Sequence, residues 1–309
     1  MIFQMKKPSG LTGRVSESNC FQIKDLTEGT FQSQLISLQH KYHKMENIIS
    51  QIRAKSGFII DMDGVIYHGN KLLPGVNEFL GWLEKADKKY LFLTNSSERT
   101  PRELHEKLKR LGINVEEDHF YTSALATAGF LASQKPNGSA YIIGDAGLIH
   151  AMYSIGYTIN NVNPDYVVVG DTNGYNFQSI QLAVNLVLKG ARLIGTNPDV
   201  SGPVENGIAP STKALIAPIE IATGKKAYFV GKPNPLMMRI ALKKLGVKRE
   251  EAIVIGDRMD TDVRCGLESE IDTLLVLSGI TDRNEIDNFP YKPRYILDGI
   301  ASLITDQES

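Results

Sequence analysis

The chain has 309 residues, of which 42% are apolar and 22% charged, with 34 basic and 35 acidic side chains and a formal net charge of −1. This composition is typical of a globular protein with about two domains. The balanced charge excludes the strongly basic surface that a nucleic-acid or membrane-surface partner requires. No apolar run approaches the ~18 residues of a membrane helix, so we expect neither a nucleic-acid partner nor a membrane partner.

The cysteine content and the first residues bear on the compartment. Only Cys20 and Cys265 occur, far apart and in unlike contexts, which argues against a disulfide framework and favours a reducing compartment. The basic residues at the start are not followed by the apolar segment of a secretory signal. We therefore expect a cytoplasmic protein.

Residues 1–56 differ from the rest of the chain. The first part is polar and has no clear period, whereas from Thr30 to Lys55 apolar residues recur at intervals of three and four. That spacing predicts a helix. We interpret 1–56 as a partly helical N-terminal extension without chemistry of its own.

From Gly57 onward, short apolar runs alternate with amphipathic helical stretches such as 101–112 and 235–246. The runs are GFII (57–60), KYLFL (89–93), AYII (140–143), YVVV (166–169), ARLI (191–194), AYFV (227–230), AIVI (252–255) and TLLV (273–276). Runs this short and this continuously apolar suit parallel strands covered on both faces. The alternation predicts an α/β, doubly wound, Rossmann-like fold.

The spacing of the runs predicts an inserted domain. Asn95 and Lys232 follow two of the runs and have 136 residues between them, far more than one crossover helix requires. We therefore expect a core formed by 57–129 and 226–309, with 130–225 as a smaller inserted α/β domain.

Polar side chains follow four of the apolar runs at the point where each run ends. They are Asp61 and Asp63; Thr94, Asn95 and Ser96; Lys232; and Asp257 with Asp262. Each alone is more simply explained as a helix cap or a loop residue. In an open α/β sheet, however, ligands bind beyond the carboxyl ends of the strands. Carboxylates gather in one cleft only where something offsets their repulsion, and a cation and a lysine would do so.

Mg²⁺ is the cation that fits this set of residues, because it prefers carboxylate, water and phosphate oxygens. Asp61 and Asp257 could supply the carboxylates. Asp61 and Asp63 are two residues apart, so on extended backbone both side chains face the same way. The six histidines show no paired spacing and the two cysteines are scattered, so a zinc or other transition-metal site is not expected.

These motifs resemble those of the haloacid dehalogenase superfamily. Asp61-Met62-Asp63-Gly64-Val65 resembles its first motif, and Thr94-Asn95, Lys232 and Gly256-Asp257-Arg258 with Asp262 resemble the second, third and fourth. The stretch Thr196-Asn197-Pro198-Asp199 and the runs 230–233, 256–262 and 272–281 resemble the NagD-like branch, whose cap domain is inserted between the second and third motifs. The likeness covers residues 55–305.

The resemblance implies a Mg²⁺-dependent phosphatase that acts on a small phosphate monoester through an aspartyl-phosphate. It implies that Asp61 attacks phosphorus, and that Asp61, the backbone carbonyl of Asp63 and Asp257 hold Mg²⁺. It also implies that Thr94, Asn95 and Ser96 bind the phosphoryl oxygens and that Lys232 neutralises their charge. Asp262 and Asn197 would support the site. Asp63 would protonate the leaving oxygen, which requires a pKa about 3 units above its reference value of ~3.9.

Two stretches depart from the family pattern. Ser211-Thr212-Lys213 stands where this branch usually carries a glycine-rich stretch, and Ser269-Glu270 stands where an Ala-Gly pair is common. The substrate therefore stays open among nucleoside monophosphates, sugar phosphates, phosphoglycolate and pyridoxal phosphate. A cap-mediated homodimer is reasonable.

Three other functions remain as alternatives. A phospho-accepting signalling domain also places an aspartate, an acidic pair, a threonine and a lysine on strand ends, but such domains are short and lack an inserted domain. A phosphomutase would use the same aspartate. A binding protein that has lost catalysis is disfavoured, because all the expected polar residues are present.

Overall fold

The structure is a computed structural model that describes residues 39–40, 42–204 and 207–304. The chain divides into two compact units, 1–51 and 52–309. In the first unit the described residues are helical, and this helix runs to residue 53. Residues 30–38 of the expected helix, and Cys20, lie outside the described residues.

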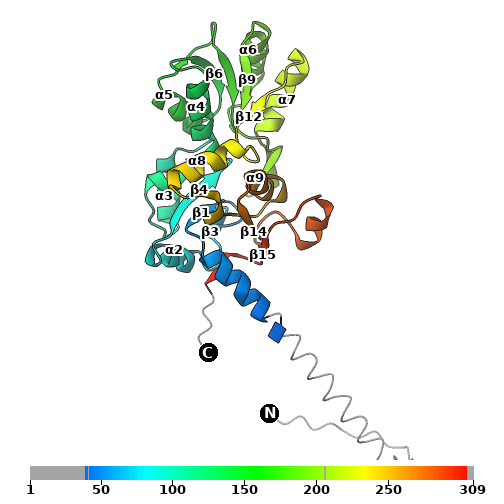
Figure 1. Ribbon diagram of the computed structural model, residues 1–309. Helices are drawn as coiled ribbons and strands as arrows, with labels where there is room; N and C mark the ends of the chain where they lie inside the picture. Colours follow the sequence, from blue (N-terminus) through cyan, green and yellow to red (C-terminus); the bar gives the residue numbers. More distant parts are fainter. Residues whose placement is uncertain (1–38, 41, 205–206, 305–309) are drawn as a thin grey trace, which may run out of the picture. The chain divides into compact units, whose positions relative to one another are not determined.

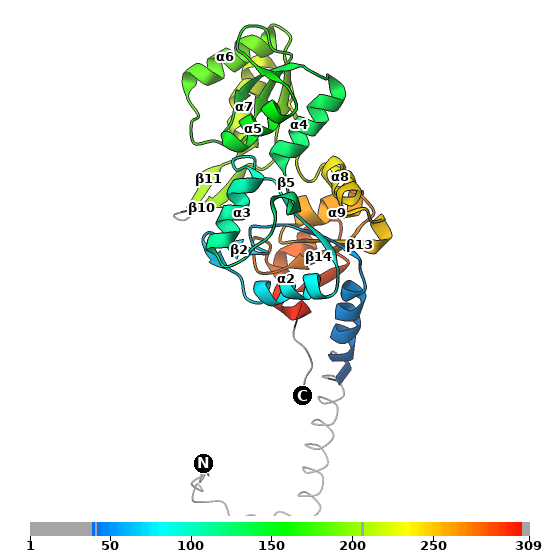
Figure 2. The same cartoon turned by 90° about the vertical axis from the view of Figure 1, so that its left-hand side faces the viewer.

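The larger sheet of the second unit has six parallel strands in the order β15-β14-β13-β1-β4-β5. They are β1 (Gly57–Ile60), β4 (Lys89–Thr94), β5 (Phe120–Thr122), β13 (Ala252–Gly256), β14 (Asp272–Val276) and β15 (Tyr295–Leu297). Helices lie around this sheet (Figures 1 and 2), namely α2 (Val76–Lys85), α3 (Pro101–Arg110), α8 (Pro235–Leu245) and α9 (Arg264–Glu268). Every residue of β1 and β13 is buried, as expected for parallel strands covered on both faces.

The smaller sheet has five parallel strands in the order β12-β9-β8-β6-β7. They are β6 (Ser139–Ile143), β7 (Thr158–Ile159), β8 (Tyr166–Val169), β9 (Arg192–Gly195) and β12 (Tyr228–Phe229). Its helices are α4 (Ser123–Gln134), α5 (Ala146–Ser154), α6 (Phe177–Leu188) and α7 (Thr212–Thr223) (Figure 2). The predicted fold class, an α/β core with an inserted smaller α/β unit, is confirmed.

Two short antiparallel hairpins complete the described strands. β2 (Tyr67–His68) pairs with β3 (Lys71–Leu72), and β10 (Ser201–Val204) pairs with β11 (Gly207–Pro210). None of the described helices combines the length and the apolar composition of a bilayer-spanning segment.

One strand lies in a different sheet from the one expected. The run 227–230 was assigned to the core, but β12 pairs in parallel with β9, with Tyr228 opposite Ile194 and Phe229 opposite Gly195. The expected boundary between 225 and 226 is therefore too early. A two-residue strand has no period that distinguishes one parallel sheet from another, so only its partner reveals its place.

The two faces of the smaller sheet pack against different layers. Val168 belongs to a buried cluster that includes residues of α4, α5 and α8, whereas Val167 and Val169 belong to a second cluster with residues of α6 and α7. This alternation follows from the two-residue period of a strand. The first cluster also contains Ile59 and Leu93 of the larger sheet, so a continuous apolar core joins the two sheets.

Local sequence signals place the ends of the two predicted helices. Thr100 and Glu103 form a reciprocal capping box at the start of α3, and Pro101 occupies its first turn. Asn234 caps α8, which ends at Gly246 in the left-handed conformation, at φ 63°. Both helices begin directly after a loop that carries predicted site residues, so their caps help to define those loops.

Candidate active site

The first acidic loop leaves the sheet at the end of β1. The backbone N–H of Asp61 donates to the carbonyl of Ile255 in the neighbouring strand at 2.8 Å, which continues the sheet by one residue. Gly64 has φ 79°, and a Cβ on it would lie 2.4 Å from Oδ2 of Asp257. Only glycine fits both this backbone conformation and this close approach, so Gly64 allows the loop to turn beside Asp257.

Three carboxylates converge at the ends of β1 and β13. Asp61, Asp257 and Asp262 each offer an oxygen, and these oxygens all lie within 4.8 Å of one another. Asp257 and Asp262 are almost completely buried, at 2% and 1% exposed. Asp257 Oδ2 accepts from the N–H of Ile280 at 2.7 Å, whereas no described group donates a hydrogen bond to its buried Oδ1. The cluster thus has at least one oxygen free for a ligand.

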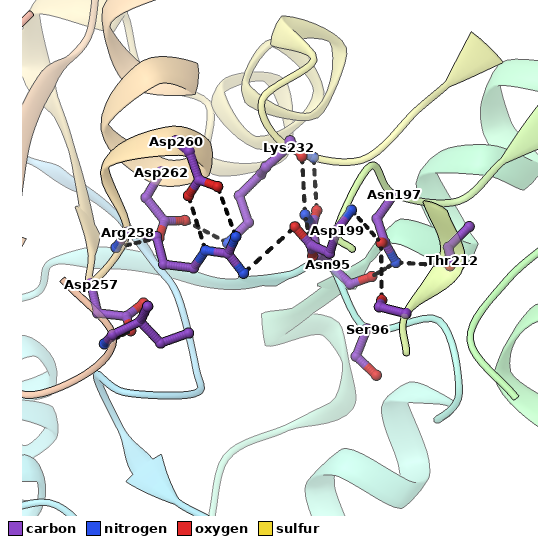
Figure 3. Close-up of polar contacts among 12 residues, drawn as sticks. Asn95, Ser96, Asn197, Asp199, Thr212, Lys232, Asp257, Arg258, Asp260 and Asp262 are labelled. Carbon is purple, nitrogen blue, oxygen red and sulfur yellow. Dashed lines mark hydrogen bonds and ion pairs between the residues drawn. The ribbon is translucent and has the colours of Figure 1, made fainter. Parts of the chain in front are cut away.

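Lys232 lies among these carboxylates. Its Nζ is 2.6 Å from Oδ1 of Asp61 and 2.6 Å from Oδ1 of Asp262, and it also donates to the carbonyl of Leu93 at 3.2 Å. The lysine is 3% exposed. All three protons of the ammonium group are therefore directed at fixed acceptors, of which Figure 3 shows Asp262.

Burial shapes the charge of this cluster. It raises the pKa of Asp61 well above its usual value, an effect that Lys232 opposes and the neighbouring carboxylates reinforce. Burial, together with the charge of Asp262, raises the pKa of Asp257 to about 7. The pKa of Lys232 is raised because its two carboxylate partners outweigh the cost of burying the charge. One lysine thus leaves the negative charge only partly compensated.

Asp63 has surroundings unlike those of Asp61. Its side chain is exposed at the rim, but the walls of the crevice reduce its hydration, and this desolvation raises its pKa against the opposing charge of Lys107. The hydroxyl of Tyr67 donates to Oδ2 of Asp63 at 3.3 Å. The Nζ of Lys107 lies 3.4 Å from the centre of the Tyr67 ring. The pKa of Asp63 is thus raised as that of Asp61 is, but its carboxyl is exposed and does not contact Lys232 among the described residues, which leaves it accessible for proton transfer.

The loop after β4 carries the next predicted residues. Thr94 is 6% exposed and its hydroxyl accepts from the N–H of Ser96 at 3.1 Å. The amide of Asn95 bonds the backbone of Lys232 twice, accepting from its N–H at 2.7 Å and donating to its carbonyl at 3.0 Å. The same amide donates to Asp199 at 3.0 Å. The Asn95 side chain is thus engaged with protein groups and places Lys232 next to Asp61.

Two family models match the chain. The haloacid dehalogenase-like hydrolase model matches residues 58–158, and a HAD-hydrolase-like model matches residues 229–303. The chain is 45% identical over 246 residues to a dihydroxyacetone phosphatase of Corynebacterium glutamicum, covering 80% of this chain and 90% of that protein. It is 40% identical over 245 residues to the ribonucleotide monophosphatase NagD of Escherichia coli, covering 79% and 96%.

The chain belongs to the haloacid dehalogenase-like hydrolases. The solved NagD structure from E. coli superposes with a TM-score of 0.76 at 39% identity, over 80% of this chain and 98% of that one. A solved glycerol phosphate phosphatase of Mycobacterium tuberculosis, in complex with magnesium, has a TM-score of 0.78 at 27% identity, over 83% and 78%. The predicted family, its NagD-like branch and the predicted enzyme class are confirmed.

In this NagD-like hydrolase, the predicted residues around Asp61 come together. Asp61, Lys232, Asp257 and Asp262 form one cluster, and Asn95 borders it through Lys232. Asn197 is 1% exposed and lies behind the loop, where its amide donates to the carbonyl of Asn95 at 2.9 Å. It therefore supports the loop from the smaller sheet's side.

Sequence reasoning did not assign roles to Arg258 and Asp171, which lie near this cluster. Arg258 forms hydrogen bonds to Asp260 and lies 3.7 Å from Oδ1 of Asp199, an oxygen that is buried and accepts no hydrogen bond from the described residues (Figure 3). Asp171 follows β8 and bonds Ser97, beside the predicted phosphate loop. Asp171 follows an apolar run as Asp61 does, and that signal would have found it.

The donor set fits a hard divalent cation. The cluster offers carboxylate oxygens, which Mg²⁺ prefers, and it has the free, buried Oδ1 of Asp257. Three carboxylates gather around the single ammonium of Lys232, and a divalent cation would offset their remaining negative charge. The cluster contains Asp262 in addition to the two carboxylates expected to bind metal, and it leaves the Asp63 side chain outside.

Both departures from the family pattern have a local structural context. Ser211 and Thr212 direct their hydroxyls at Asp171, whereas the Lys213 side chain is exposed. Glu270 has φ 57°, a conformation that glycine adopts far more readily than a residue with a Cβ. The Glu270 position therefore still has the backbone of the glycine that is common there.

Proposed function

We propose that this chain is a Mg²⁺-dependent phosphatase that hydrolyses small organic phosphate monoesters through an aspartyl-phosphate on Asp61. The observation that carries the proposal is the position of the Asp61 carboxylate, 2.6 Å from the Lys232 ammonium and beside Asp257 and Asp262. The relatives support it, since they include proteins named dihydroxyacetone phosphatase, ribonucleotide monophosphatase and acid sugar phosphatase.

Asp61 is the nucleophile in this proposal. A carboxylate divides the hydrolysis into two displacements, in which an Asp61 oxygen first bonds phosphorus and water then attacks the phospho-aspartate. Attack by an anion on an anionic phosphate requires charge neutralisation. Lys232 provides one fixed positive charge for the phosphoryl oxygens and the attacking carboxylate. Mg²⁺, held by Asp61, Asp257 and the backbone carbonyl of Asp63, would supply the rest.

Asp63 is the general acid and base. Its raised pKa favours the protonated carboxyl that the leaving oxygen needs in the first step. The resulting carboxylate then takes a proton from the attacking water in the second step. The hydrogen bond from Tyr67 holds the Asp63 side chain in one orientation. Because its carboxyl lies outside the acidic cluster, a metal bound there would not stabilise its charged form directly.

The loop after β4 binds the phosphoryl group. Thr94 and Ser96 offer a hydroxyl and backbone N–H groups for its oxygens, as donors at a loop after a parallel strand commonly do. The Asn95 side chain has a different part in this proposal from the one first expected. Since its amide bonds both backbone groups of Lys232 and also Asp199, it positions the lysine and leaves phosphate to its neighbours.

The smaller sheet and its helices form the cap that covers the leaving group. The expected start of the cap at residue 130 falls inside α4, so we move it to the start of that helix at Ser123, and we move the end of the cap from 225 to the strand β12, Tyr228–Phe229. The relatives act on different phosphate esters by name, so the proposal covers the ester class. A cytoplasmic location and a homodimer stay predictions.

The test is release of inorganic phosphate from a panel of phosphate monoesters with Mg²⁺ or with EDTA. The parent chain should release phosphate only with the metal, and Asp61→Asn should lower kcat by at least ~10⁴-fold because the amide is not a nucleophile. Asp260→Asn is the matched control, since Asp260 follows the same strand as Asp257, is exposed, and among the described residues bonds Arg258 alone. Equal activity of the Asp61 variant and the parent would contradict the proposal.

A further inference from the structure

Asp171 is a carboxylate with an unusual number of hydrogen-bond donors. It follows β8, and its Oδ1 accepts from Ser211 Oγ at 2.5 Å and from the backbone N–H and the hydroxyl of Thr212, both at 2.9 Å. Its Oδ2 accepts from Asn197 Nδ2 at 2.8 Å and from Ser97 Oγ at 3.3 Å. Thr212 is the first residue of the 12-residue helix α7, so the helix N-terminus also favours the charge.

The two residues bound to Oδ2 both lead to the loop after β4. Ser97 belongs to that loop and is 0% exposed, and its hydroxyl accepts from the N–H of Asp171 at 2.9 Å. The Asn197 amide donates to Asp171 at 2.8 Å and to the carbonyl of Asn95 at 2.9 Å; Figure 3 shows Asn197 next to Asn95. Asp171 therefore holds the loop at two points on either side of Ser96.

Close backbone packing keeps the same loop against the cap. A Cβ on Gly147 in α5 would lie 2.6 Å from the carbonyl oxygens of Ser97 and Arg99, and a Cβ on Gly170 would lie 2.6 Å from Ser97 Oγ. The N–H of Gly147 also donates to the carbonyl of Glu98 at 2.8 Å. At Gly147 no side chain separates α5 from the backbone of this loop, so cap and loop are in direct contact there.

We propose that Asp171 is a positioning residue of the phosphate site. Through Ser97 and Asn197 it fixes the loop that carries Asn95 and Ser96, and so couples the position of the cap to phosphate binding. This inference rests on the proposed function, in which that loop binds the phosphoryl group. Asp171 itself does not touch the reacting atoms in this scheme, since both of its oxygens are occupied by protein donors.

Ser211 and Thr212, which depart from the family pattern, hold Asp171 in place in this inference. Ser211 adds a hydroxyl to Asp171 where the family pattern usually has glycine, and Thr212 adds a hydroxyl and the first N–H of α7. Carboxylates that accept charge-assisted hydrogen bonds are held firmly. The two residues therefore fix the Asp171 carboxylate from the side opposite to the loop.

The test compares Asp171→Asn with Asp165→Asn in the full chain. Asp165 precedes β8, at the other end of the strand from Asp171, and its carboxylate bonds Lys135 and Ser139 away from the loop. An amide at 171 must turn its NH₂ towards existing donors. We expect Asp171→Asn to raise both KM for a phosphate ester and the inhibition constant of inorganic phosphate about tenfold, as one poorly satisfied hydrogen bond would. Asp165→Asn should leave both within twofold of the parent.

A second variant keeps the inference open to refutation if Asp171→Asn does not fold. Ser97→Ala removes one hydroxyl and should raise the inhibition constant of phosphate about fivefold. Parent-like constants in a folded Asp171→Asn or Ser97→Ala protein would overturn the inference, as would an equal change in Asp165→Asn. A parent chain that releases no phosphate from any ester would instead refute the proposed function, and it would be seen before any variant is made.

Discussion

Lys232→Met removes the positive charge from the centre of the acidic cluster and keeps much of the side-chain volume. In the parent, the ammonium is 3% exposed and contacts Asp61 and Asp262, each at 2.6 Å. Methionine leaves these carboxylates buried and without a cation. The variant should therefore be less stable than the parent, and the loss should depend on pH and on Mg²⁺.

The size of the loss follows from the burial of the partners. Removal of one member of a buried ion pair typically costs about 3–5 kcal/mol, which is a large part of a usual unfolding free energy of ~5–15 kcal/mol. For a folded unit of this size the melting temperature should fall by roughly 10 °C. Protonation of the remaining carboxylates limits the loss, because a neutral buried acid costs less than a charged one.

The stability of Lys232→Met relative to the parent should depend on pH. Burial raises the pKa of Asp61 and Lys232 opposes that rise, so removal of the ammonium raises the folded-state pKa of Asp61 further. Between the unfolded-state and folded-state pKa of Asp61, the folded state then binds more protons than the unfolded state. Stability of Lys232→Met should then rise as the pH falls from 7 to 5, relative to the parent. Mg²⁺ should restore part of the stability at pH 7, because it binds the folded state alone.

Urea unfolding followed by circular dichroism, at pH 5 and pH 7 and with Mg²⁺ or EDTA, measures these effects. Lys225→Met is the control, since Lys225 is exposed and its replacement should change the free energy of unfolding by less than about 0.5 kcal/mol. A loss below 1 kcal/mol for Lys232→Met, or a loss that is the same at both pH values, would refute the account of Lys232 as a buried counter-charge.

Three further predictions address the acid, the metal site and the fold. Asp63→Asn should slow hydrolysis of an alkyl phosphate about 100-fold more than that of p-nitrophenyl phosphate, whose leaving group needs no proton; equal losses in steady-state assays would contradict the acid role. Burial raises the pKa of Asp257 from 3.8 to about 7, so the metal-free folded state holds a proton that the unfolded state loses. In EDTA, stability should fall from pH 4 to pH 7 by up to ~4 kcal/mol in the parent and much less in Asp257→Asn. Glu270→Gly should raise the free energy of unfolding by about 0.5–1 kcal/mol, because φ is 57° at this position. The exposed ion pair with Arg249 that this variant loses contributes little. Glu268→Gly, in the last turn of α9, should instead lower the free energy of unfolding by a similar amount.

The positions of most strands along the sequence, and the acidic cluster, were predictable because each depends on local sequence. A buried parallel strand is a short apolar run, and the residue after it lies at the carboxyl edge of the sheet. Asp61, Asp257 and Asp262 each follow such a run and meet in space. Gly64, directly after Asp63, has a φ of 79°, which a glycine adopts without strain.

Other features depend on contacts that no local pattern encodes. β5 and β15 have three residues each, too few to distinguish a strand from an apolar loop, and neither was predicted. β12 was placed in the wrong sheet for the same reason. The partners of the Asn95 side chain were likewise not encoded locally, because the backbone of Lys232 lies on one side of it and Asp199 on the other.

The rule that located the acidic cluster applies to both sheets of the molecule. β4 of the larger sheet ends in the loop with Asn95 and Ser97, and β8 and β9 of the smaller sheet end in Asp171 and Asn197, which bond that same loop. The carboxyl ends of two parallel sheets therefore meet at one crevice. Of these two residues of the smaller sheet, Asn197 was expected to support the site and Asp171 was not. Ligands bind beyond the carboxyl ends of parallel strands. An inserted domain whose strands end at that same edge therefore contributes side chains to the site. Polar residues that follow its strands are candidate site residues, as those of the core are.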